Sequence, residues 1–189
     1  MEHVDPIHLK PARQLSAALY QATGIRVSDC YQCRKCTSGC PVTFAMDIFP
    51  DQIIRLVQLG QEARVLSCNT IWICAACETC TTRCPNQIDI AGVMDYLKER
   101  AVKAGIQIPQ PRTYAFHRAF LDDICRRGRV FEGRLMLGYL RKSGELTRKL
   151  TTGGLTSDLR MGWQMLMKGR MPLRPKGIKG KQEIKKILS

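Results

Sequence analysis

One short cysteine pattern occurs twice in this chain and limits its possible folds more than any other feature. The pattern is Cys-x-x-Cys-x-x-Cys-x-x-x-Cys-Pro, and its cysteines are Cys30, Cys33, Cys36 and Cys40 in the first array and Cys74, Cys77, Cys80 and Cys84 in the second. The two arrays are offset by 44 residues. An internal repeat of this kind predicts two equivalent sites.

The spacing of these cysteines is typical of 4Fe-4S clusters and differs from that of zinc sites. Zinc favours pairs of Cys-x-x-Cys separated by a longer spacer, with four ligands around one ion. Here three thiols lie within seven residues, followed by a fourth before a proline. In two-cluster ferredoxins the fourth cysteine of such a run ligates the other cluster. We therefore predict two 4Fe-4S clusters, one on Cys30, Cys33, Cys36 and Cys84 and the other on Cys74, Cys77, Cys80 and Cys40.

The rest of the sequence supplies little further chemistry. Cys68 and Cys125 stand apart from the arrays and are expected to be small buried hydrophobes. Trp72, just before the second array, is expected to keep water away from a cluster. Neither a dinucleotide-binding nor a phosphate-binding glycine loop is present, so a flavin, a nicotinamide or ATP would belong to a partner. We predict no catalytic residue in this chain.

The cysteine usage and the hydropathy predict a cytoplasmic chain without a membrane span. Clustered cysteines in a chain of 189 residues are typical of metal sites in a reducing compartment, whereas a disulfide framework spreads them over a small domain. Residues 1–10 lack the apolar region of a secretory signal. No stretch approaches the roughly 20 apolar residues of a membrane-spanning helix.

The hydrophobic pattern predicts an all-α fold. Pro50 is expected to open a helix that Gly60 closes, and Asp89 to cap a helix that ends near Gly105. Further helices are expected over 12–22 and at three apolar stripes downstream: Phe116, Phe120 and Ile124; Leu135, Met136, Tyr139 and Leu140; and Leu159, Trp163, Leu166 and Met167. Only 26–28 is predicted to be extended, 151–157 is predicted to be a loop, and 171–189 to be an arm ending in a short basic helix.

The charge of +14 divides the chain in two. Residues 1–108 hold 11 Lys and Arg against 10 Asp and Glu, whereas residues 109–189 hold 19 against 6. We predict a cluster-binding domain over 1–108 and, over 109–189, a basic helical extension with a C-terminal arm. Such an asymmetry indicates a surface for an acidic partner, which could be a protein, a nucleic acid or an anionic membrane.

The two arrays with their flanking residues resemble the C subunit of heterodisulfide reductase. The resemblance rests on CYQCRKCTSGCP at 30–41 and IWICAACETCTTRCP at 71–85, and extends to the helical spacer, the helix after Asp89 and the basic tail near residue 177. It implies an α-helical ferredoxin fold with two 4Fe-4S clusters. It also implies an electron-transfer component of a hetero-oligomeric complex, placed between the flavin-containing A subunit and the disulfide-active B subunit of heterodisulfide reductase.

Two other functions remain open at this point. The chain could be the iron–sulfur subunit of another flavin-linked dehydrogenase, because such subunits share the helical ferredoxin motif. It could also be a zinc-dependent nucleic-acid binder, which cysteine arrays beside a basic segment would allow. The cysteine spacing disfavours zinc, and basic runs are more often protein-docking or solvated surfaces, so we expect protein partners and no nucleic acid.

Overall fold

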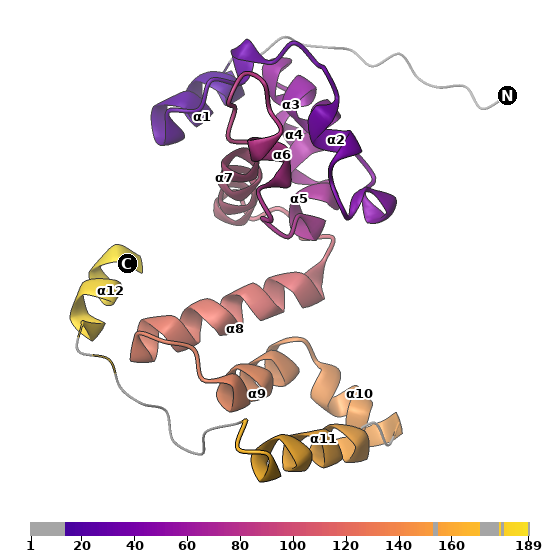
Figure 1. Ribbon diagram of the computed structural model, residues 1–189, viewed down its shortest axis with the longest axis vertical. Coiled ribbons are helices and arrows are strands. Elements are labelled where there is room, and N and C mark those ends of the chain that lie inside the picture. The colour runs from indigo at the N-terminus through magenta and orange to yellow at the C-terminus, as the bar shows by residue number, and fades with distance from the viewer. Residues whose placement is uncertain (1–13, 153–154, 171–177, 179, 189) are drawn as a thin grey trace, which may run out of the picture. The chain divides into compact units, whose positions relative to one another are not determined.

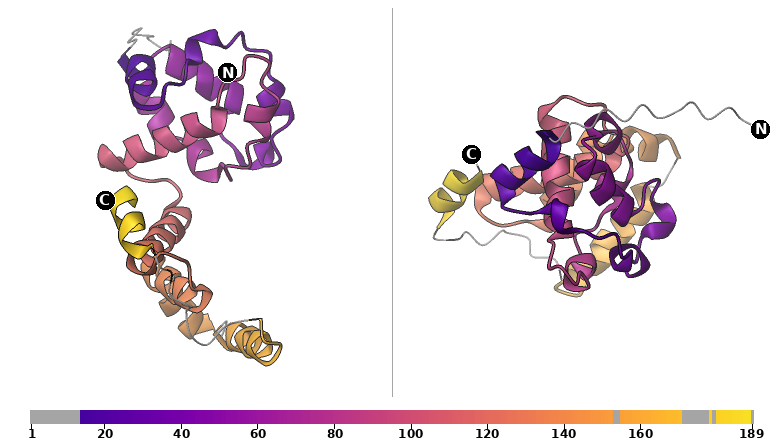
Figure 2. Two further views of the ribbon diagram at one scale, coloured as in Figure 1. Left: turned by 60° about the vertical axis from the view of Figure 1, so that its left-hand side comes forward. Right: turned by 90° about the horizontal axis from the view of Figure 1, so that it is seen from above.

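The computed structural model describes residues 14–152, 155–170, 178 and 180–188. Over these residues every regular element is a helix, as Figures 1 and 2 show, and the expectation of an all-α chain is confirmed there. The chain divides into two compact units, Met1–Gln110 and Pro111–Ser189. No described helix combines the length and the apolarity that crossing a membrane requires.

The first unit contains both cysteine arrays within a set of short helices. These are α1 (Gln14–Thr23), η1 (Val27–Asp29), α2 (Lys35–Ser38), η2 (Thr43–Ala45), α3 (Pro50–Gln58), α4 (Glu62–Leu66), α5 (Thr70–Ile73), α6 (Thr79–Thr82) and α7 (Ile90–Lys103). Helix α3 packs against α1, α2 and α4, and α7 packs against α1, α4, α5 and α6. Each array is therefore followed by a helix that forms part of the core.

The core of the first unit is apolar and well buried. Its fully buried side chains include Leu15 and Leu19 of α1, Ile53, Ile54 and Val57 of α3, and Val93, Met94 and Leu97 of α7. Burying one such side chain contributes about 1.5–3 kcal/mol. This core holds α3 and α7 in place, and with them the loops that carry the cysteines.

The ends of α3 and α7 follow the sequence signals. Pro50 is the first residue of α3, and Gly60 follows that helix with a φ of 67°. The Asp89 side chain accepts a hydrogen bond of 2.8 Å from the Gly92 backbone N–H and so caps α7, and Gly105 follows the helix with a φ of 64°. A positive φ costs glycine little, which explains why both helices end there.

The second unit contains α8 (Pro111–Arg127), α9 (Glu132–Lys142), α10 (Glu145–Thr152), α11 (Leu155–Met167) and α12 (Lys181–Leu188). Helices α8 and α9 lie side by side as a hairpin, and α12 packs against α8. The predicted stripe of α8 is not its buried face, because Phe116 is 43% exposed while Ala115 and Ala119 are buried. Small residues at the contact let the two helices approach closely.

Two predictions of local structure were wrong. Residues 26–28 were expected to be extended, but 27–29 form the 3₁₀ helix η1, which the Gln58 side chain holds by donating to the backbone carbonyls of Val27 (2.7 Å) and Cys30 (3.3 Å). Residues 151–157 were expected to be a loop, but α10 continues to Thr152 and α11 begins at Leu155. The low helix propensity of threonine costs only a few tenths of a kcal/mol, too little to end a helix.

The C-terminal prediction is confirmed only in part. A short helix, α12, forms over Lys181–Leu188 as expected. Residues 171–177 and 179 of the predicted arm, and residues 12–13 of the first predicted helix, lie outside the described residues.

Candidate metal centre

The internal repeat is present in the backbone as well as in the sequence. Within each array two non-glycine residues adopt a left-handed conformation: Gln32 and Arg34 in the first, both at φ 63°, and Ala76 and Glu78 in the second, at 49° and 58°. The short helices α2 and α6 then begin at equivalent positions. Non-glycine residues rarely adopt this conformation, which costs on the order of 1–3 kcal/mol each.

Such left-handed residues give the loops a shape suited to an anion. Alternation of right-handed and left-handed residues turns successive backbone N–H groups toward one side and creates a concavity that binds anions, including iron–sulfur centres. A 4Fe-4S cluster with four thiolate ligands is anionic. The paired conformations at identical positions therefore fit the cluster that the cysteine spacing predicts.

A threonine after the third cysteine ties each array to the helix that follows it. Thr37 accepts a hydrogen bond of 3.1 Å from the Asp51 backbone N–H and donates to the Asp51 carboxylate. Thr81 accepts one of 3.2 Å from the Ala91 backbone N–H and donates to Asp89 at 3.1 Å. Both threonines thus link the cysteine loops to the N-terminal turns of α3 and α7, which the core holds.

The two arrays lie against each other. Helices α2 and α6 pack together, and the Arg83 side chain lies so close to Gly39 that a Cβ atom there would be 2.6 Å from Arg83 Cδ. In addition, the Asn86 side-chain amide donates to the backbone carbonyl of Asp29. The residues around Cys84 therefore lie beside the turn that leads into Cys30.

One cavity collects cysteines from both arrays. Its lining includes Cys40 from the first array together with Cys74, Cys77 and Cys80 from the second. The remaining wall is mainly apolar and comes from Val42, Met46, Pro50, Ala75, Ala91 and Met94, with Glu78 and Thr79. Trp72 was expected to keep water away from a cluster. It is 3% exposed but does not line this cavity, where apolar residues such as Val42, Met46 and Met94 form the wall instead.

The cysteines of the first array are less enclosed. Cys30 lies close enough to Cys36 to affect its pKa, Cys36 is buried, and Cys33 is exposed. Cys84 is half-buried, and the Asn86–Asp29 hydrogen bond brings its segment to this side. Among the described residues, no three His, Cys, Asp or Glu side chains converge as the ligands of a single metal ion would. Thiolates around a cubane each bind a different iron atom and so stand farther apart.

Burial makes most of these thiols poor acids. Burial raises the pKa of Cys36 to about 11, and it also raises the pKa of Cys74 and that of Cys80. The exposed Cys77 differs, because a hydrogen bond with the Thr79 hydroxyl lowers its pKa. Iron binds thiolates, so cluster binding at the buried positions must displace protons.

The two remaining cysteines do not join these groups. Cys68 is 4% exposed and its Sγ donates to the Val65 backbone carbonyl at 3.0 Å, which confirms that it is a buried structural thiol. Cys125 lies in α8 and is half-buried rather than buried, so the expectation is met only in part. Neither lines the cavity that contains Cys40.

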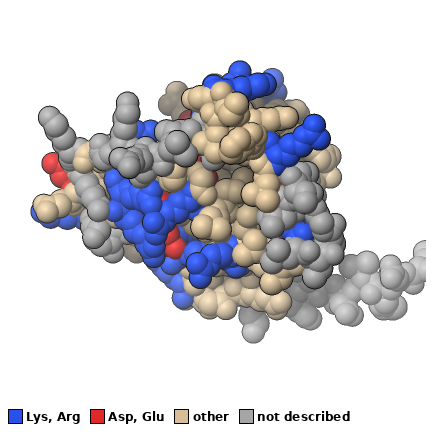
Figure 3. All heavy atoms as spheres, turned by 90° about the horizontal axis from the view of Figure 1, so that it is seen from below, with Lys and Arg blue, Asp and Glu red and all other residues tan. Residues whose placement is uncertain are grey.

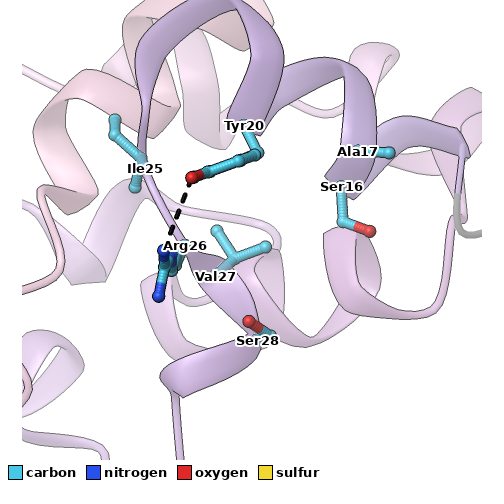
Figure 4. A pocket seen from close by; sticks show the side chains of 7 residues that line it. All are labelled: Ser16, Ala17, Tyr20, Ile25, Arg26, Val27 and Ser28. Carbon is cyan, nitrogen blue, oxygen red and sulfur yellow. Dashed lines mark hydrogen bonds between the residues drawn. The ribbon is translucent and has the colours of Figure 1, made fainter.

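A second pocket, of about 420 Å³, lies just before the first array and contains no cysteine. Figure 4 shows Tyr20 of α1 pointing toward Arg26; the Arg26 guanidinium donates to the Tyr20 hydroxyl at 3.5 Å. The Arg26 Cζ also lies 5.5 Å from the centre of the Tyr20 ring. These contacts fasten the chain to α1 where it enters the first array, a structural role.

The sequence did not predict that Lys98 lies beside a cysteine array. Its side chain is 12% exposed, and its Nζ donates to the Cys74 backbone carbonyl at 3.3 Å and pairs with Asp95 at 3.0 Å. Its position in α7, 24 residues after Cys74, gave no local signal, since only tertiary packing brings the two together. A cation so placed is well situated to tune a cluster electrostatically.

Comparison with known proteins agrees with this geometry. Residues 26–88 match the family model of a 4Fe-4S dicluster domain. The chain is 32% identical over 97 residues to the C subunit of an H(2):CoB-CoM heterodisulfide,ferredoxin reductase of Methanothermobacter marburgensis, a match covering 51% of this chain and 52% of that relative.

Two further relatives have related names. The chain is 29% identical over 115 residues to the iron-sulfur C subunit of the CoB--CoM heterodisulfide reductase of Methanopyrus kandleri, covering 60% of each chain. It is 35% identical over 92 residues to the C subunit of a ferredoxin:CoB-CoM heterodisulfide reductase of Methanosarcina mazei, covering 49% of this chain and 56% of the relative. The matches thus span about half to three-fifths of these relatives.

Proposed function

We propose that this chain, a homologue of the C subunits of heterodisulfide reductases with a 4Fe-4S dicluster domain, is the electron-transfer iron–sulfur component of a heterodisulfide reductase or a related complex. One observation carries the proposal: Cys40 of the first array lines the same cavity as Cys74, Cys77 and Cys80 of the second. Such sharing of cysteines is the arrangement by which two-cluster ferredoxins hold their clusters side by side.

The ligand assignment follows from that arrangement. One cluster would be bound by Cys74, Cys77, Cys80 and Cys40, and the other by Cys30, Cys33, Cys36 and Cys84. The Asn86–Asp29 hydrogen bond supports the place of Cys84 in the second set, because it joins the segments next to Cys84 and Cys30. Two clusters so linked would lie close together and exchange electrons readily.

The clusters, when bound, supply reversible one-electron chemistry, and the protein supplies the surroundings. Apolar residues such as Val42, Met46 and Met94 keep water out of the shared cavity. Lys98 places a positive charge near Cys74. Cys33 and Cys77, the second cysteines of the two arrays, are both exposed and mark where a partner can approach most closely.

We further propose that electrons pass between a flavin-containing A subunit and a disulfide-active B subunit, and that the chain has no catalytic residue of its own. The naming of the relatives as C subunits supports membership of a hetero-oligomeric complex. All ten cysteines are free, which suits a reducing cytoplasm. In this proposal residues 1–108 hold the clusters and residues 109–189, including the C-terminal arm, dock the partners; the division after Gln110 supports this.

The decisive experiment is metal analysis of the anaerobically purified chain together with electron paramagnetic resonance. Two cubanes require about eight irons and eight sulfides per chain, and reduction should give a spectrum broadened by magnetic coupling between neighbouring clusters. Zinc as the dominant metal would refute the proposal. Two uncoupled signals would refute the crossed ligand assignment alone.

A further inference from the structure

The second unit contains a groove whose lining is strongly basic. It lies between the end of α8 and helix α9 and has a volume of about 870 Å³. Five of its lining residues are basic, and none is acidic: Arg126, Arg127, Arg134, Arg141 and Lys142. We call this feature the cationic groove. Figure 3 shows Lys and Arg side chains gathered on the face in view, with few acidic residues visible among them.

Two carboxylates behind the groove fix its geometry. Asp123 is 4% exposed; it accepts a hydrogen bond of 2.7 Å from the Phe131 backbone N–H, which holds the turn between α8 and α9. Arg127 lies 3.7 Å from the same carboxylate, with its Cζ 5.5 Å from the centre of the Phe131 ring. These contacts join the groove wall at this end to the turn between α8 and α9.

Asp122 is the second carboxylate, and it neutralises only part of the positive charge of the cationic groove. Lys142 donates a hydrogen bond to Asp122 and lowers its pKa, and the nearby Arg118 and Arg126 lower it further. Five cations thus stand against two acids, Asp122 and Asp123, neither of which lines the groove. Arg134 and Arg141, both on α9, are among the groove cations exposed to solvent, and neither is in one of the ion pairs with Asp122 or Asp123.

The groove also has an apolar component. Phe131 and Leu137 line it, and Leu137 is 52% exposed. Among the apolar residues of this unit that the structure describes, only Ala115, Ala119 and Leu140 are buried. The large apolar side chains exposed on α8, α9 and α11 are available for contact with a partner.

We propose that the cationic groove binds an acidic, amphipathic segment of the partner protein, whose carboxylates pair with Arg134 and Arg141 and whose apolar side chains cover Leu137. The inference rests on the proposed function, which supplies the need for a protein partner. Arginine beside exposed aromatic and aliphatic side chains is typical of protein interfaces, since a guanidinium pairs with a carboxylate through two hydrogen bonds. Phosphate binding by nucleic acid uses the cations alone and leaves Leu137 without a role.

Charge reversal tests the electrostatic part. The double variant Arg134→Glu, Arg141→Glu is compared with Arg160→Glu, Arg170→Glu, which reverses two exposed arginines outside the groove. Binding of the full-length holoprotein to its co-purifying partner is measured across a salt series. The groove variant should bind at least about tenfold more weakly and with a smaller salt dependence, because reversed charges slow association. Equal losses in both variants would overturn the proposal.

Cross-linking tests the location. A photo-reactive residue is placed at Leu137 or at its neighbour Met136, which is 57% exposed and does not line the groove. Cross-links from Leu137, and not from Met136, should map by mass spectrometry to one acidic segment of the partner. Equal labelling from both positions, or labelling of a segment without acidic residues, would show that the groove is not the docking site.

Two further measurements separate this inference from the proposed function. Iron and sulfide content is determined for every variant, because the groove contains no cluster ligand and reversal should leave it unchanged. If both clusters are present and the partner binds the groove variant normally, the groove assignment fails while the proposed function stands. Binding of single-stranded RNA that depends on Arg134 and Arg141, without an effect on the partner, would instead assign the groove to nucleic acid.

Discussion

Cys40 and Cys74 line one cavity although they belong to different cysteine arrays and are separated by 33 residues of sequence. They lie close enough for Cys40 to contribute to the raised pKa of Cys74, after the larger effect of burial. The packing of α2 against α6 produces this proximity, since each helix carries the third cysteine of its array. A ligand that binds Cys74 is thus within reach of a cysteine from the other array.

The first prediction concerns this sharing of cysteines. Replacing Cys40 by Ala should damage the cluster held mainly by Cys74, Cys77 and Cys80, whereas Cys84→Ala should damage the cluster of the first array. Paramagnetic NMR of the reduced protein assigns each damaged cluster to its array. Cys68→Ala is the control and should keep full iron content, since Cys68 is a buried thiol that donates to the Val65 backbone carbonyl and does not line the shared cavity. Damage confined to the mutated cysteine's own array would contradict the crossed assignment.

The second prediction compares the equivalent threonines. Thr37→Val and Thr81→Val each remove one hydroxyl that links an array to its helix. Thr37→Val should cost more, about 1–3 kcal/mol, because its partner Asp51 is 6% exposed and loses a donor that water cannot replace, whereas Asp89 is exposed. The measurement is the thermal unfolding midpoint of the holoproteins. Equal decreases in the unfolding midpoint, or a larger decrease for Thr81→Val, would contradict the greater importance of Thr37.

The third prediction concerns the electrostatic role of Lys98. Its Nζ lies 3.3 Å from the Cys74 backbone carbonyl, so its charge favours the more negative, reduced cluster. Lys98→Met should lower the reduction potential of the second-array cluster by on the order of tens of millivolts. Lys103→Met, on the same helix but 79% exposed, provides the control. A redox titration in which the signals of the two clusters are resolved measures this reduction potential. Identical potentials in both variants would show that Lys98 does not tune the cluster.

The fourth prediction follows from the buried thiols. Since burial raises the pKa of Cys36 to about 11 and raises those of Cys74 and Cys80, these groups are protonated in the apoprotein at neutral pH. Reconstitution should therefore release protons and should accelerate as the pH rises from about 7 to about 9. After removal of the clusters with a chelator, anaerobic reconstitution is followed by absorbance at each pH. A rate independent of pH would mean that deprotonation does not limit assembly.

Burial provides a fifth prediction that contrasts the two units. Leu97 of α7 is 0% exposed, so Leu97→Ala should destabilise the first unit by about 2–5 kcal/mol. Leu137→Ala removes the same atoms from a side chain that is 52% exposed and should change stability by less than about 1 kcal/mol. Thermal unfolding of both holoproteins measures the difference. A large effect at Leu137 would contradict the exposure of its side chain.

Much of the local structure could be predicted because its causes lie within a few residues. The repeated spacing placed the cysteine loops, Pro50 and Gly60 bounded α3, and Asp89 capped α7 through a hydrogen bond three residues away. The left-handed pairs were not foreseen, since Gln32, Arg34, Ala76 and Glu78 have no preference for that conformation. The surrounding loop imposes it on them.

The sequence by itself determined the number and spacing of the cysteines, the helical character of the chain and the concentration of positive charge after residue 108. Only the tertiary structure decided which apolar residues wall the cavity that Cys40 shares with the second array, that Lys98 lies beside Cys74, and that α8 buries Ala119 rather than Phe120. The reason is physical: helix periods and caps are local interactions, whereas these relationships depend on which helices pack together, and many pairings are compatible with the same local pattern.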